Sequence, residues 1–459
     1  MEKNSIFLYV LIILIFFAAL FIRLQPSAYE PVIGIDAHYH VRMAETLLQT
    51  GSFSDSLSFG GRNYIYPPGL HITLASLSFL TSLPVETVGK FFITFIASLV
   101  VIPVFLIGKT LWGKKEGLIT ALLLVFIPVH IWKTSSNILV DAIAILLLSI
   151  SFYFLIQKKW KYYFALSFFT MLFSPFVGLF SILLSVPNID KRIIRRNTKF
   201  LIPIAVISFI LFCLFSFIII DVYSGLNSDI SSALYEDIDI FEFLFRINPI
   251  VFVFGIVGII MSLRHASKNN KSTKNLLFWI IVIVASMLFL ETDRWLFYLS
   301  VPLSLFAGFS LIRLSKSKII LALFVILIIL SGSFLSYHAL EKLEWGVISE
   351  NKLEAFEWIR DNTEKNSVIL SSIVEGHWIT NLAKRKNIID GNLIARNDVN
   401  ERYQDVKDFF SGIRQKEVIK KYNISYVFSS SEFNNITNFE IVFENNSTLV
   451  LKTFATPQE

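Results

Sequence analysis

Long apolar runs, separated by short polar stretches, are the feature that most constrains this chain. The first run, SIFLYVLIILIFFAALFI at residues 5–22, is about as long as the roughly 20 apolar residues that one helical crossing of a bilayer needs. Of the 459 residues, 54% are apolar and 17% are charged, whereas soluble domains average about a quarter charged residues. The pattern predicts a polytopic α-helical membrane protein.

We expect about eleven membrane-spanning helices, which is the number of such runs. They are predicted near residues 5–22, 88–108, 117–131, 138–156, 162–174, 176–188, 200–220, 248–263, 275–291, 295–312 and 318–336. The first run lacks a small-residue cleavage site, so we interpret it as a retained helix and not as a signal peptide. Ser174-Pro175 is expected to break one apolar stretch into a tight helical hairpin.

Lysine and arginine gather after the even-numbered runs. The clusters are Lys109, Lys114 and Lys115; Lys158, Lys159 and Lys161; Lys191, Arg192, Arg195, Arg196 and Lys199; Arg264, Lys268, Lys271 and Lys274; and Arg313, Lys316 and Lys318. Because basic loops stay in the cytoplasm, this pattern predicts a multi-pass protein of the cell membrane with a cytoplasmic N-terminus. The net charge of +6 comes from these clusters and not from a basic face on a soluble module, so we expect no nucleic-acid partner.

Two domains follow from this topology. Residues 1–337 are expected to form the transmembrane domain, whose first outer loop spans residues 23–87. Residues 338–459 are expected to form a small extracellular α/β domain. In that tail LEAFEWIRDNTEKNS has helical spacing, SVILSSI and NISYVFSS are typical of short buried strands, and NFEIVFENNSTLVLKTF is typical of a hairpin.

The first outer loop carries the most unusual residues. Its residues 34–45 read GIDAHYHVRMAE, with one aspartate and two histidines within five residues. Ionisable groups beside a bilayer are costly unless they function or face water. Residues 40–49 are predicted to be helical, with Thr50-Gly51 closing the helix. Pro67-Pro68-Gly69 then turns the chain into an apolar helix that ends near Leu83-Pro84. We expect this helix to lie flat at the outer interface, because a further crossing would invert the charge pattern.

Four stretches in order resemble the GT-C superfamily of membrane glycosyltransferases, and within it most resemble the catalytic subunit of oligosaccharyltransferase and its archaeal relatives. The first is the D-x-x-Y-H-x-R pattern that begins at Asp36, with its later Tyr-Pro-Pro-Gly turn. The others are WKTSSNILVDAIAILLLSISFYF, ETDRWLFYLSVPLSLFAGF, and AFEWIRDNT followed by VILSSIVEGHWITNLAKRKNIIDGN. The resemblance runs over most of the chain and implies a GT-C-like fold.

The chain departs from the family pattern at three places. The family carries W-W-D-Y-G where this chain has residues 373–378, IVEGHW, and that motif reads the hydroxyl of the acceptor sequon. The second acidic motif of the family usually has another metal ligand two residues after its aspartate, where this chain has Ile143. The acidic loop 221–247 has no clear match to the family's glutamate motif, although Glu236 is a candidate by position.

The resemblance implies an active site at the outer membrane face. A polyprenyl-phosphate donor needs a group that activates the acceptor and a positive charge for the departing phosphate. Asp36 and Asp141 are the candidate catalytic residues, and Arg294 is the candidate phosphate ligand because a guanidinium matches phosphate oxygens. For each aspartate the alternative is a helix N-cap, and for Arg294 it is an interfacial ion pair with Asp293.

The remaining candidates are assigned to substrate or metal binding. Besides Arg294, the candidate substrate-binding residues are His38, His40, Arg42, Tyr66, Glu236 and His377. Asp36, Asp141 and His38 are the candidate ligands of an Mn²⁺ or Mg²⁺ ion, and His38 and Asp36 would share a cation if their segment is extended. The alternative for Arg42 is a snorkelling side chain, and for the two histidines of the loop it is local hydrogen bonding.

The sequence therefore predicts a glycosyltransferase that uses a polyprenyl (dolichyl-type) phosphate donor. Its partners would be the lipid bilayer, the lipid-linked sugar, and a protein, lipid or glycan acceptor. Two alternatives remain open: an oligosaccharyltransferase that acts on protein asparagine, and a transporter or scaffold without enzymatic activity. A transporter would need polar groups at mid-bilayer, whereas the ionisable groups here fall at the outer ends of the runs.

Overall fold

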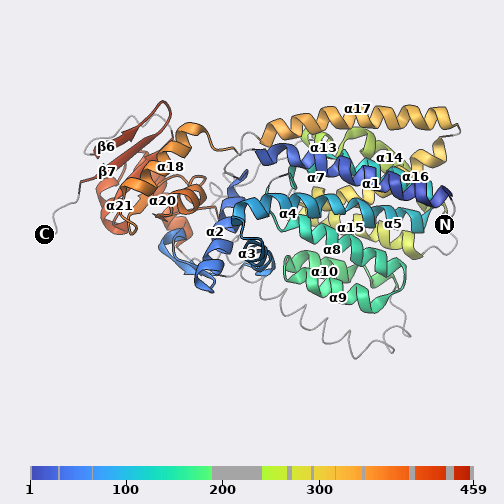
Figure 1. Cartoon of the computed structure of the whole chain (residues 1–459), viewed down its shortest axis with the longest axis horizontal. Helices are drawn as coiled ribbons and strands as arrows, with labels where there is room; N and C mark the ends of the chain where they lie inside the picture. Colours follow the sequence, from blue (N-terminus) through green and yellow to red (C-terminus); the bar gives the residue numbers. More distant parts are fainter. Residues whose placement is uncertain are drawn as a thin grey trace. The chain divides into compact units, whose positions relative to one another are not determined.

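A computed structural model describes most of the chain. The described residues are 3–28, 32–64, 66–135, 137–188, 240–265, 271–290, 294–315, 317–343, 347–391, 398–430 and 439–454. They fall into two compact units (Figure 1). The helical unit holds residues 3–28, 90–188 and 240–343, and the mixed unit holds residues 32–89 and 347–454.

The helical unit is built from α-helices joined by short turns. Its elements are α1 (Lys3–Leu24), η1 (Gln25–Ala28), α4 (Val85–Leu99, whose first turn belongs to the mixed unit), α5 (Val101–Leu111), α6 (Lys114–Val125), α7 (Pro128–Trp132), α8 (Asp141–Ile156), α9 (Trp160–Met171), α10 (Pro175–Leu183), η3 (Val186–Asn188), α13 (Ile240–Ile247), α14 (Pro249–His265), α15 (Lys271–Leu290), α16 (Arg294–Leu314) and α17 (Lys318–Leu343).

Several of these helices suit a bilayer. Within the described ranges, four stretches are long and apolar enough to cross it: Ile6–Leu24, Val85–Leu111, Arg294–Leu314 and Lys318–His338. A fifth crossing results if the bent pair Phe241–Ile247 and Pro249–Arg264 is one span. Helices occur at every predicted run except 200–220, which lies outside the described residues. The chain is a helical membrane protein, and the count of about eleven crossings stays a prediction.

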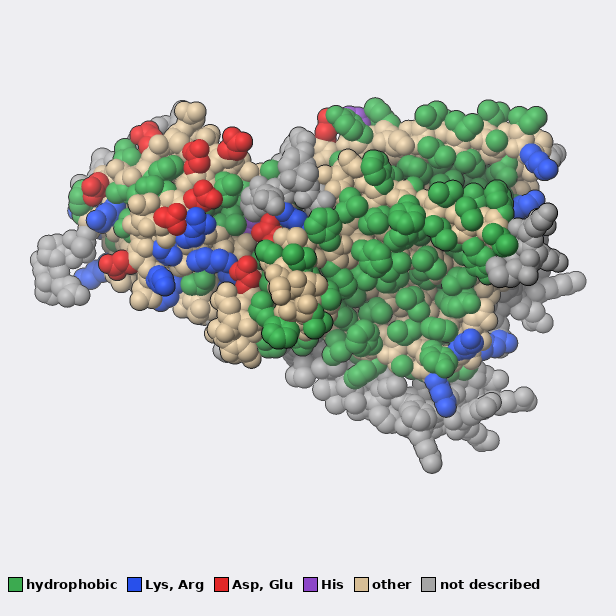
Figure 2. Space-filling view, in the orientation of Figure 1, with side chains coloured by type: hydrophobic (Ala, Val, Ile, Leu, Met, Phe, Trp, Pro, Cys, Tyr) green, Lys and Arg blue, Asp and Glu red, His purple; other side chains and the backbone are tan. Residues whose placement is uncertain are grey.

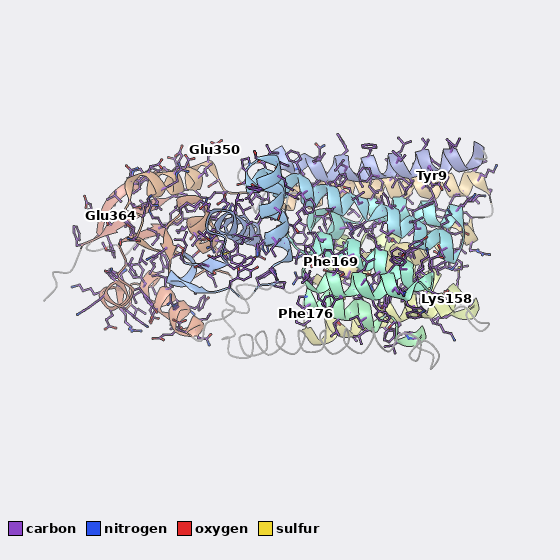
Figure 3. All side chains as sticks on the ribbon, turned by 60° about the horizontal axis from the view of Figure 1, so that its bottom comes forward. Tyr9, Lys158, Phe169, Phe176, Glu350 and Glu364 are labelled. Atoms are coloured by element: carbon purple, nitrogen blue, oxygen red, sulfur yellow. The ribbon has the colours of Figure 1, made fainter. Side chains whose placement is uncertain are left out.

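The surface of the helical unit agrees with this interpretation. Large apolar side chains are exposed on its outer helices, among them Phe21 on α1 at 67% and Phe334 on α17 at 62%, and Figure 2 shows them spread over one face. Lipid is the solvent that such a surface suits. Basic side chains gather at one end of this face (Figure 2), and Figure 3 shows Lys158 near the end at which Tyr9 lies.

The predicted break at Ser174-Pro175 is confirmed. Helix α9 ends at Met171, and α10 begins at Pro175 with the Ser174 hydroxyl accepting the first-turn Val177 N–H. Gly178 lets the two helices touch, since a Cβ there would lie 2.3 Å from the Met171 side chain. The first residue of a helix has no intrahelical partner for its N–H, so proline at this position costs no hydrogen bond and the hairpin forms without an internal kink.

Helix α16 is the centre of the helical unit. Its residues 295–311 are all buried, and it packs against α6, α14 and α15. Contact with α14 requires Gly258, where a Cβ would lie 2.1 Å from the Phe306 carbonyl oxygen. This packing fixes the first residue of α16, Arg294, at the end of a rigid helix.

The mixed unit contains the first outer loop and the tail. Its elements are α2 (Ile35–Thr50), β1 (Ser54–Asp55), η2 (Ser58–Gly60), β2 (Arg62–Asn63), α3 (Gly69–Thr81), α18 (Glu350–Asn362), β3 (Val368–Leu370), α19 (Gly376–Trp378), the π-helical turn η5 (Ile379–Ala383), β4 (Lys386–Asn387), α20 (Val399–Phe410), α21 (Gln415–Tyr422), β5 (Tyr426–Ser429), β6 (Phe439–Glu444) and β7 (Leu449–Thr453). Its larger sheet has the order β4-β3-β5-β7-β6, parallel from β4 to β5 and antiparallel from β5 to β6.

Most of the predicted elements of this unit are present. Helix α2 ends at Thr50 with Gly51 left-handed at φ +68°, and α3 follows the Pro-Pro-Gly turn. The predicted strands and hairpin of the tail are β3, β5 and the pair β6–β7. The outer loop packs on the tail: Ile35 joins the apolar cluster around Phe356 and Trp378, and the Asn387 N–H donates to the Leu57 carbonyl.

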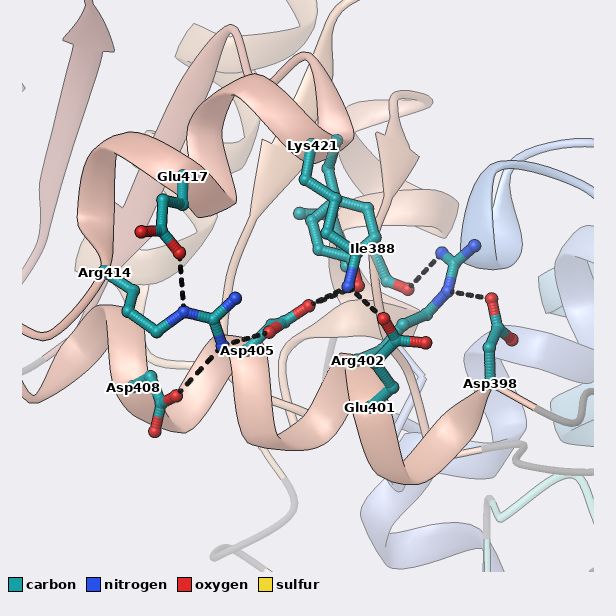
Figure 4. Close-up of polar contacts among 10 residues, drawn as sticks. Ile388, Asp398, Glu401, Arg402, Asp405, Asp408, Arg414, Glu417 and Lys421 are labelled. Atoms are coloured by element: carbon teal, nitrogen blue, oxygen red, sulfur yellow. Dashed lines mark hydrogen bonds and ion pairs between the residues drawn. The ribbon is translucent and has the colours of Figure 1, made fainter.

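A network of ion pairs joins α20 to α21 (Figure 4). The buried Asp405 carboxylate accepts from Lys421, from Arg414 at 3.3 Å and from the Tyr422 hydroxyl at 2.7 Å. Burial alone would raise the pKa of Asp405, but these hydrogen bonds and the charges of Lys421 and Arg414 outweigh it and lower that pKa below its ordinary value. This carboxylate therefore stabilises the fold of the tail.

Candidate functional site

Asp141 and Arg294 meet at two helix starts in the helical unit. Asp141 is the first residue of α8, and its side chain is 4% exposed. The Arg294 Nε donates to both carboxylate oxygens, at 2.9 and 3.1 Å, and the Tyr298 hydroxyl donates to Oδ1 at 2.6 Å. Tyr298 lies one helical turn after Arg294 on α16, so the two donors share one face.

The cap alternative for Asp141 is wrong. The residue before α8 is Val140, which makes no side-chain capping bond, and the Asp141 carboxylate is bonded to α16 instead. Arg294 keeps 45% of its side chain exposed while its Nε edge holds the carboxylate. A guanidinium has five N–H donors, and the buried Asp141 carboxylate holds this one by its Nε edge. The positive charge of Arg294 therefore lies at the surface on a buried carboxylate. Its alternative partner Asp293 lies outside the described residues.

Asp36 lies in the first turn of α2, in the mixed unit. The helix begins at Ile35 after Gly34, whose φ is +93°, and no side chain caps it. The cap alternative for Asp36 is therefore wrong as well, and the carboxylate is exposed. Because the segment is helical and not extended, the side chains of Asp36 and His38 do not face each other. The condition under which they would share a cation is not met.

His38 points into the protein. It is fully buried, and its Nδ1 lies 2.9 Å from the Asn381 amide nitrogen of η5. This hydrogen bond joins the outer loop to the tail, since Asn381 lies 343 residues further along the chain.

His40 belongs to a buried chain of hydrogen bonds. Its Nδ1 lies 2.9 Å from His71 Nε2, and His71 Nδ1 lies 2.6 Å from the Tyr64 hydroxyl. The ring of Tyr66 packs on His40 with centroids 5.0 Å apart. Burial, then the charges of His40 and Arg42, lower the pKa of His71 well below its ordinary value, so His71 stays neutral. Burial likewise raises the pKa of Tyr64, which keeps its proton.

Arg42 is part of a buried ion pair. Its Nη1 donates to Asp55 at 2.5 Å and its Nη2 donates to the Ser58 hydroxyl at 2.6 Å, with Arg42 3% and Asp55 1% exposed. The snorkelling alternative is wrong, because the guanidinium faces the protein. This pair holds α2 to the following loop, and substrate contact by Arg42 stays a prediction.

The tail segment 373–378 folds inward. Glu375 is 4% exposed, and its carboxylate accepts from the Ser372 hydroxyl at 2.7 Å, from Ser430 and from Lys352 at 3.4 Å. His377 is fully buried, 3.7 Å from Asp390, and its ring packs on Tyr39 with centroids 5.6 Å apart. Substrate contact by His377 stays a prediction, whereas Glu375 is held by donors of the tail itself.

The described side chains do not fit a divalent metal ion. Among them, no three His, Cys, Asp or Glu side chains lie close enough to hold one. Asp141 is bonded to Arg294, whose charge disfavours a cation there, and Ile143 offers no ligand. His38 bonds to Asn381 through Nδ1. Glu236, the remaining candidate of the substrate set, lies outside the described residues.

Three residues that the sequence did not indicate belong to these arrangements. Tyr298 binds Asp141, His71 binds His40, and Asn381 binds His38. A signal existed only for Tyr298, since its i, i+4 spacing from Arg294 puts both on one helix face. His71 and Asn381 are brought to their partners by the tertiary fold.

Comparisons with known proteins agree on the fold. No protein-family model matches the chain, and no curated protein does. The archaeal oligosaccharyltransferase AglB from Archaeoglobus fulgidus, in complex with an inhibitory peptide and a dolichol-phosphate, has a TM-score of 0.63 at 14% identity over 94% of this chain and 70% of that chain. ArnT from Cupriavidus metallidurans, bound to undecaprenyl phosphate, has a TM-score of 0.58 at 10% identity over 98% of both chains. The Archaeoglobus fulgidus oligosaccharyltransferase with Zn and sulfate has a TM-score of 0.56 at 15% identity over 92% and 68%.

These neighbours confirm the resemblance at the level of the fold. AglB and ArnT are both GT-C glycosyltransferases, and this chain has the fold they share. At 10–15% identity the match carries the arrangement of helices and no substrate.

Proposed function

We propose that this protein transfers a sugar or glycan from a polyprenyl-phosphate donor of the dolichyl type to an acceptor at the outer membrane face. The contact between Arg294 and Asp141 carries the proposal, because these residues are 153 positions apart and both fall in stretches that resemble the GT-C family. The neighbours add support, since AglB was determined with a dolichol-phosphate and ArnT with undecaprenyl phosphate.

Arg294 is the residue we assign to the phosphate. The acceptor oxygen or nitrogen attacks the anomeric carbon from the side opposite the phosphate, and the bond from that carbon to the phosphate oxygen breaks. The electron pair leaves with the phosphate, where a guanidinium stabilises the developing charge. Asp141 and Tyr298 orient Arg294, so they act as positioning residues.

Asp36 is the residue we assign to the acceptor. It carries an exposed carboxylate at the start of a helix whose residues 37–44 are buried, which leaves it able to accept the proton that the acceptor loses. A general base of this kind contributes about 10²- to 10⁴-fold to a rate. We place this chemistry on the outer side, with a cytoplasmic N-terminus and an extracellular tail, because the basic clusters fall after the even-numbered runs.

An oligosaccharyltransferase is the second candidate. It is favoured by the similarity to AglB, which was determined with a peptide. Against it, residues 373–378 differ from the family motif that reads the acceptor hydroxyl, and the acidic residue of this segment, Glu375, is buried and bonded within the tail. We therefore favour transfer to a lipid or glycan.

Metal dependence is a separate question. The Archaeoglobus fulgidus enzyme was determined with Zn, whereas the described side chains here do not fit a divalent ion, so no step above is built on one. We expect a chelator such as EDTA to leave transfer unchanged. Loss of transfer, restored by Mn²⁺ or Mg²⁺, would return Asp36, Asp141 and His38 to the role of candidate ligands.

The decisive experiment uses the purified full chain in nanodiscs with radiolabelled polyprenyl-phosphate sugars. Peptide, lipid and glycan acceptors are tested in parallel. We expect the label in the lipid or glycan fraction. Label in a sequon peptide would select the second candidate. The absence of transfer to any acceptor would refute glycosyl transfer.

A further inference from the structure

The tail holds the helix that carries Asp36. In the mixed unit, residues 376–384 contact α2 between His38 and Glu45. His377 packs on Tyr39, Asn381 bonds to His38, and Lys384 bonds to Glu45 at 2.6 Å. Both residues of the central contact are buried, with His38 at 0% and Asn381 at 3% exposure. A polar contact in such surroundings is expensive to break, because each group would lose its partner away from water.

The backbone around Asn381 is unusual. Asn381 lies in the π-helical turn η5, and Lys384 directly after it has a left-handed φ of +53°. Turns with π geometry are rare, and a left-handed lysine costs about 1 kcal/mol or more unless its surroundings hold it. Here the Lys384 ammonium is held between the Glu45 carboxylate and the Asn381 side chain.

These contacts determine which way the Asn381 amide faces. Lys384 Nζ lies 3.4 Å from Asn381 Oδ1, and an ammonium can only donate, so the amide oxygen faces it. The amide NH₂ therefore faces His38 and donates to Nδ1. An imidazole nitrogen that accepts carries no proton, so the proton of His38 is on Nε2.

We propose that Asn381 is a positioning residue that holds His38 as its Nε2–H tautomer and thereby fixes the first turn of α2, with Asp36, on the tail. The tautomer is a property of the fold, and the effect on transfer rests on the proposed function. Only Ala37 separates His38 from Asp36, so a change in how His38 is seated moves the backbone that carries the carboxylate. Displacements of about 1 Å near reacting groups cost up to about 10²-fold in rate.

The tautomer is tested by ¹⁵N NMR of the full chain in nanodiscs with ring-labelled histidine. The chain has seven histidines, and the His38 signals are those that vanish in His38→Asn. We expect a bare Nδ1 and a protonated Nε2 in the wild type. In Asn381→Asp the carboxylate only accepts, so Nδ1 gains a proton. A protonated Nδ1 in the wild type, or no change in Asn381→Asp, overturns the proposal.

Kinetics separate positioning from mere stability. We expect Asn381→Leu to lower kcat about ten-fold with KM unchanged. His38→Asn, whose Oδ1 replaces the accepting Nδ1, keeps most of the activity, whereas His38→Leu loses it. Asn362→Leu is the matched control, because Asn362 is exposed in the same tail. An unchanged kcat in Asn381→Leu, or an equal loss in the control, overturns the role in transfer. If the wild type transfers nothing, the proposed function fails and the NMR result alone decides on the tautomer.

Discussion

Two aspartates that the sequence assigned to one activity lie in opposite surroundings. In the helical unit, the Asp141 carboxylate is buried and receives three hydrogen bonds from α16. In the mixed unit, Asp36 is exposed, while the residues that follow it along α2 are buried. The contrast separates two functions of a carboxylate: one holds another side chain in place, and the other is available for chemistry.

The strongest test of this contrast is Asp36→Asn. The amide cannot take a proton from the acceptor, so we expect transfer to fall by about 10²- to 10⁴-fold. Stability should change by less than about 0.5 kcal/mol, because the side chain is exposed. Transfer rates and thermal unfolding of the same preparation measure both. Normal activity in this variant would remove the proposed acceptor site.

The pair of Asp141 and Arg294 should respond unequally to removal of either partner. In Arg294→Gln, a buried carboxylate loses its counter-charge, for which we expect a loss of about 3 kcal/mol in the free energy of unfolding. In Asp141→Asn the guanidinium stays half exposed to water, so we expect about 1 kcal/mol. Thermal unfolding in detergent measures the difference.

Activity gives a second view of the same pair. Both variants should raise KM for the lipid donor more than they lower kcat, since each disturbs the group that meets the phosphate. Equal destabilisation by the two variants, or a normal donor KM in Arg294→Gln, would contradict the assignment of Arg294 as an anchored cation.

Asp405 is a third carboxylate for this comparison, and it has no part in the proposed transfer reaction. Asp405→Asn should leave transfer unchanged and cost about 2 kcal/mol at pH 7, because the amide replaces a charged partner of Lys421 and Tyr422. The folded-state pKa of Asp405 is lowered, so its stabilisation is complete above the unfolded-state value of about 4 and is lost as the pH falls through the folded-state value. Unfolding from pH 7 to pH 3 should show the two proteins converging at low pH. A difference that persists there would mean that packing, and not charge, is what Asp405 supplies.

Sequence patterns could predict the features that depend on residues close together in the chain, which are the helices, their ends and the strands. Apolar runs located the helices, the Pro and Gly signals located the ends of α2 and α10, and alternation located the tail strands. The motifs also indicated Asp141 and Arg294, although not that they touch. The patterns could not show that α2 docks on a tail more than 300 residues away, where His38 is buried against Asn381. Nor could they show that Arg42 pairs with Asp55 within the outer loop. They also gave no role to Tyr298, because its partner lies on another helix.

The variant Tyr298→Phe tests whether the Tyr298 hydroxyl helps Asp141 to position Arg294, and its expected effect is the smallest. Its hydroxyl donates to Asp141 at 2.6 Å, and Tyr298→Phe removes that bond while the ring stays in the core. Because Arg294 still satisfies the carboxylate, we expect a loss of only about 1 kcal/mol in the free energy of unfolding. The Asp141 carboxylate that orients the Arg294 guanidinium would lose the donor that fixes it from Tyr298, so the donor KM should rise a few-fold with kcat nearly constant. The matched control is Tyr163→Phe, which removes a buried hydroxyl bond between α9 and α10. A similar rise in KM in the control would show that Tyr298 acts through general stability of the helical unit and not by positioning Arg294.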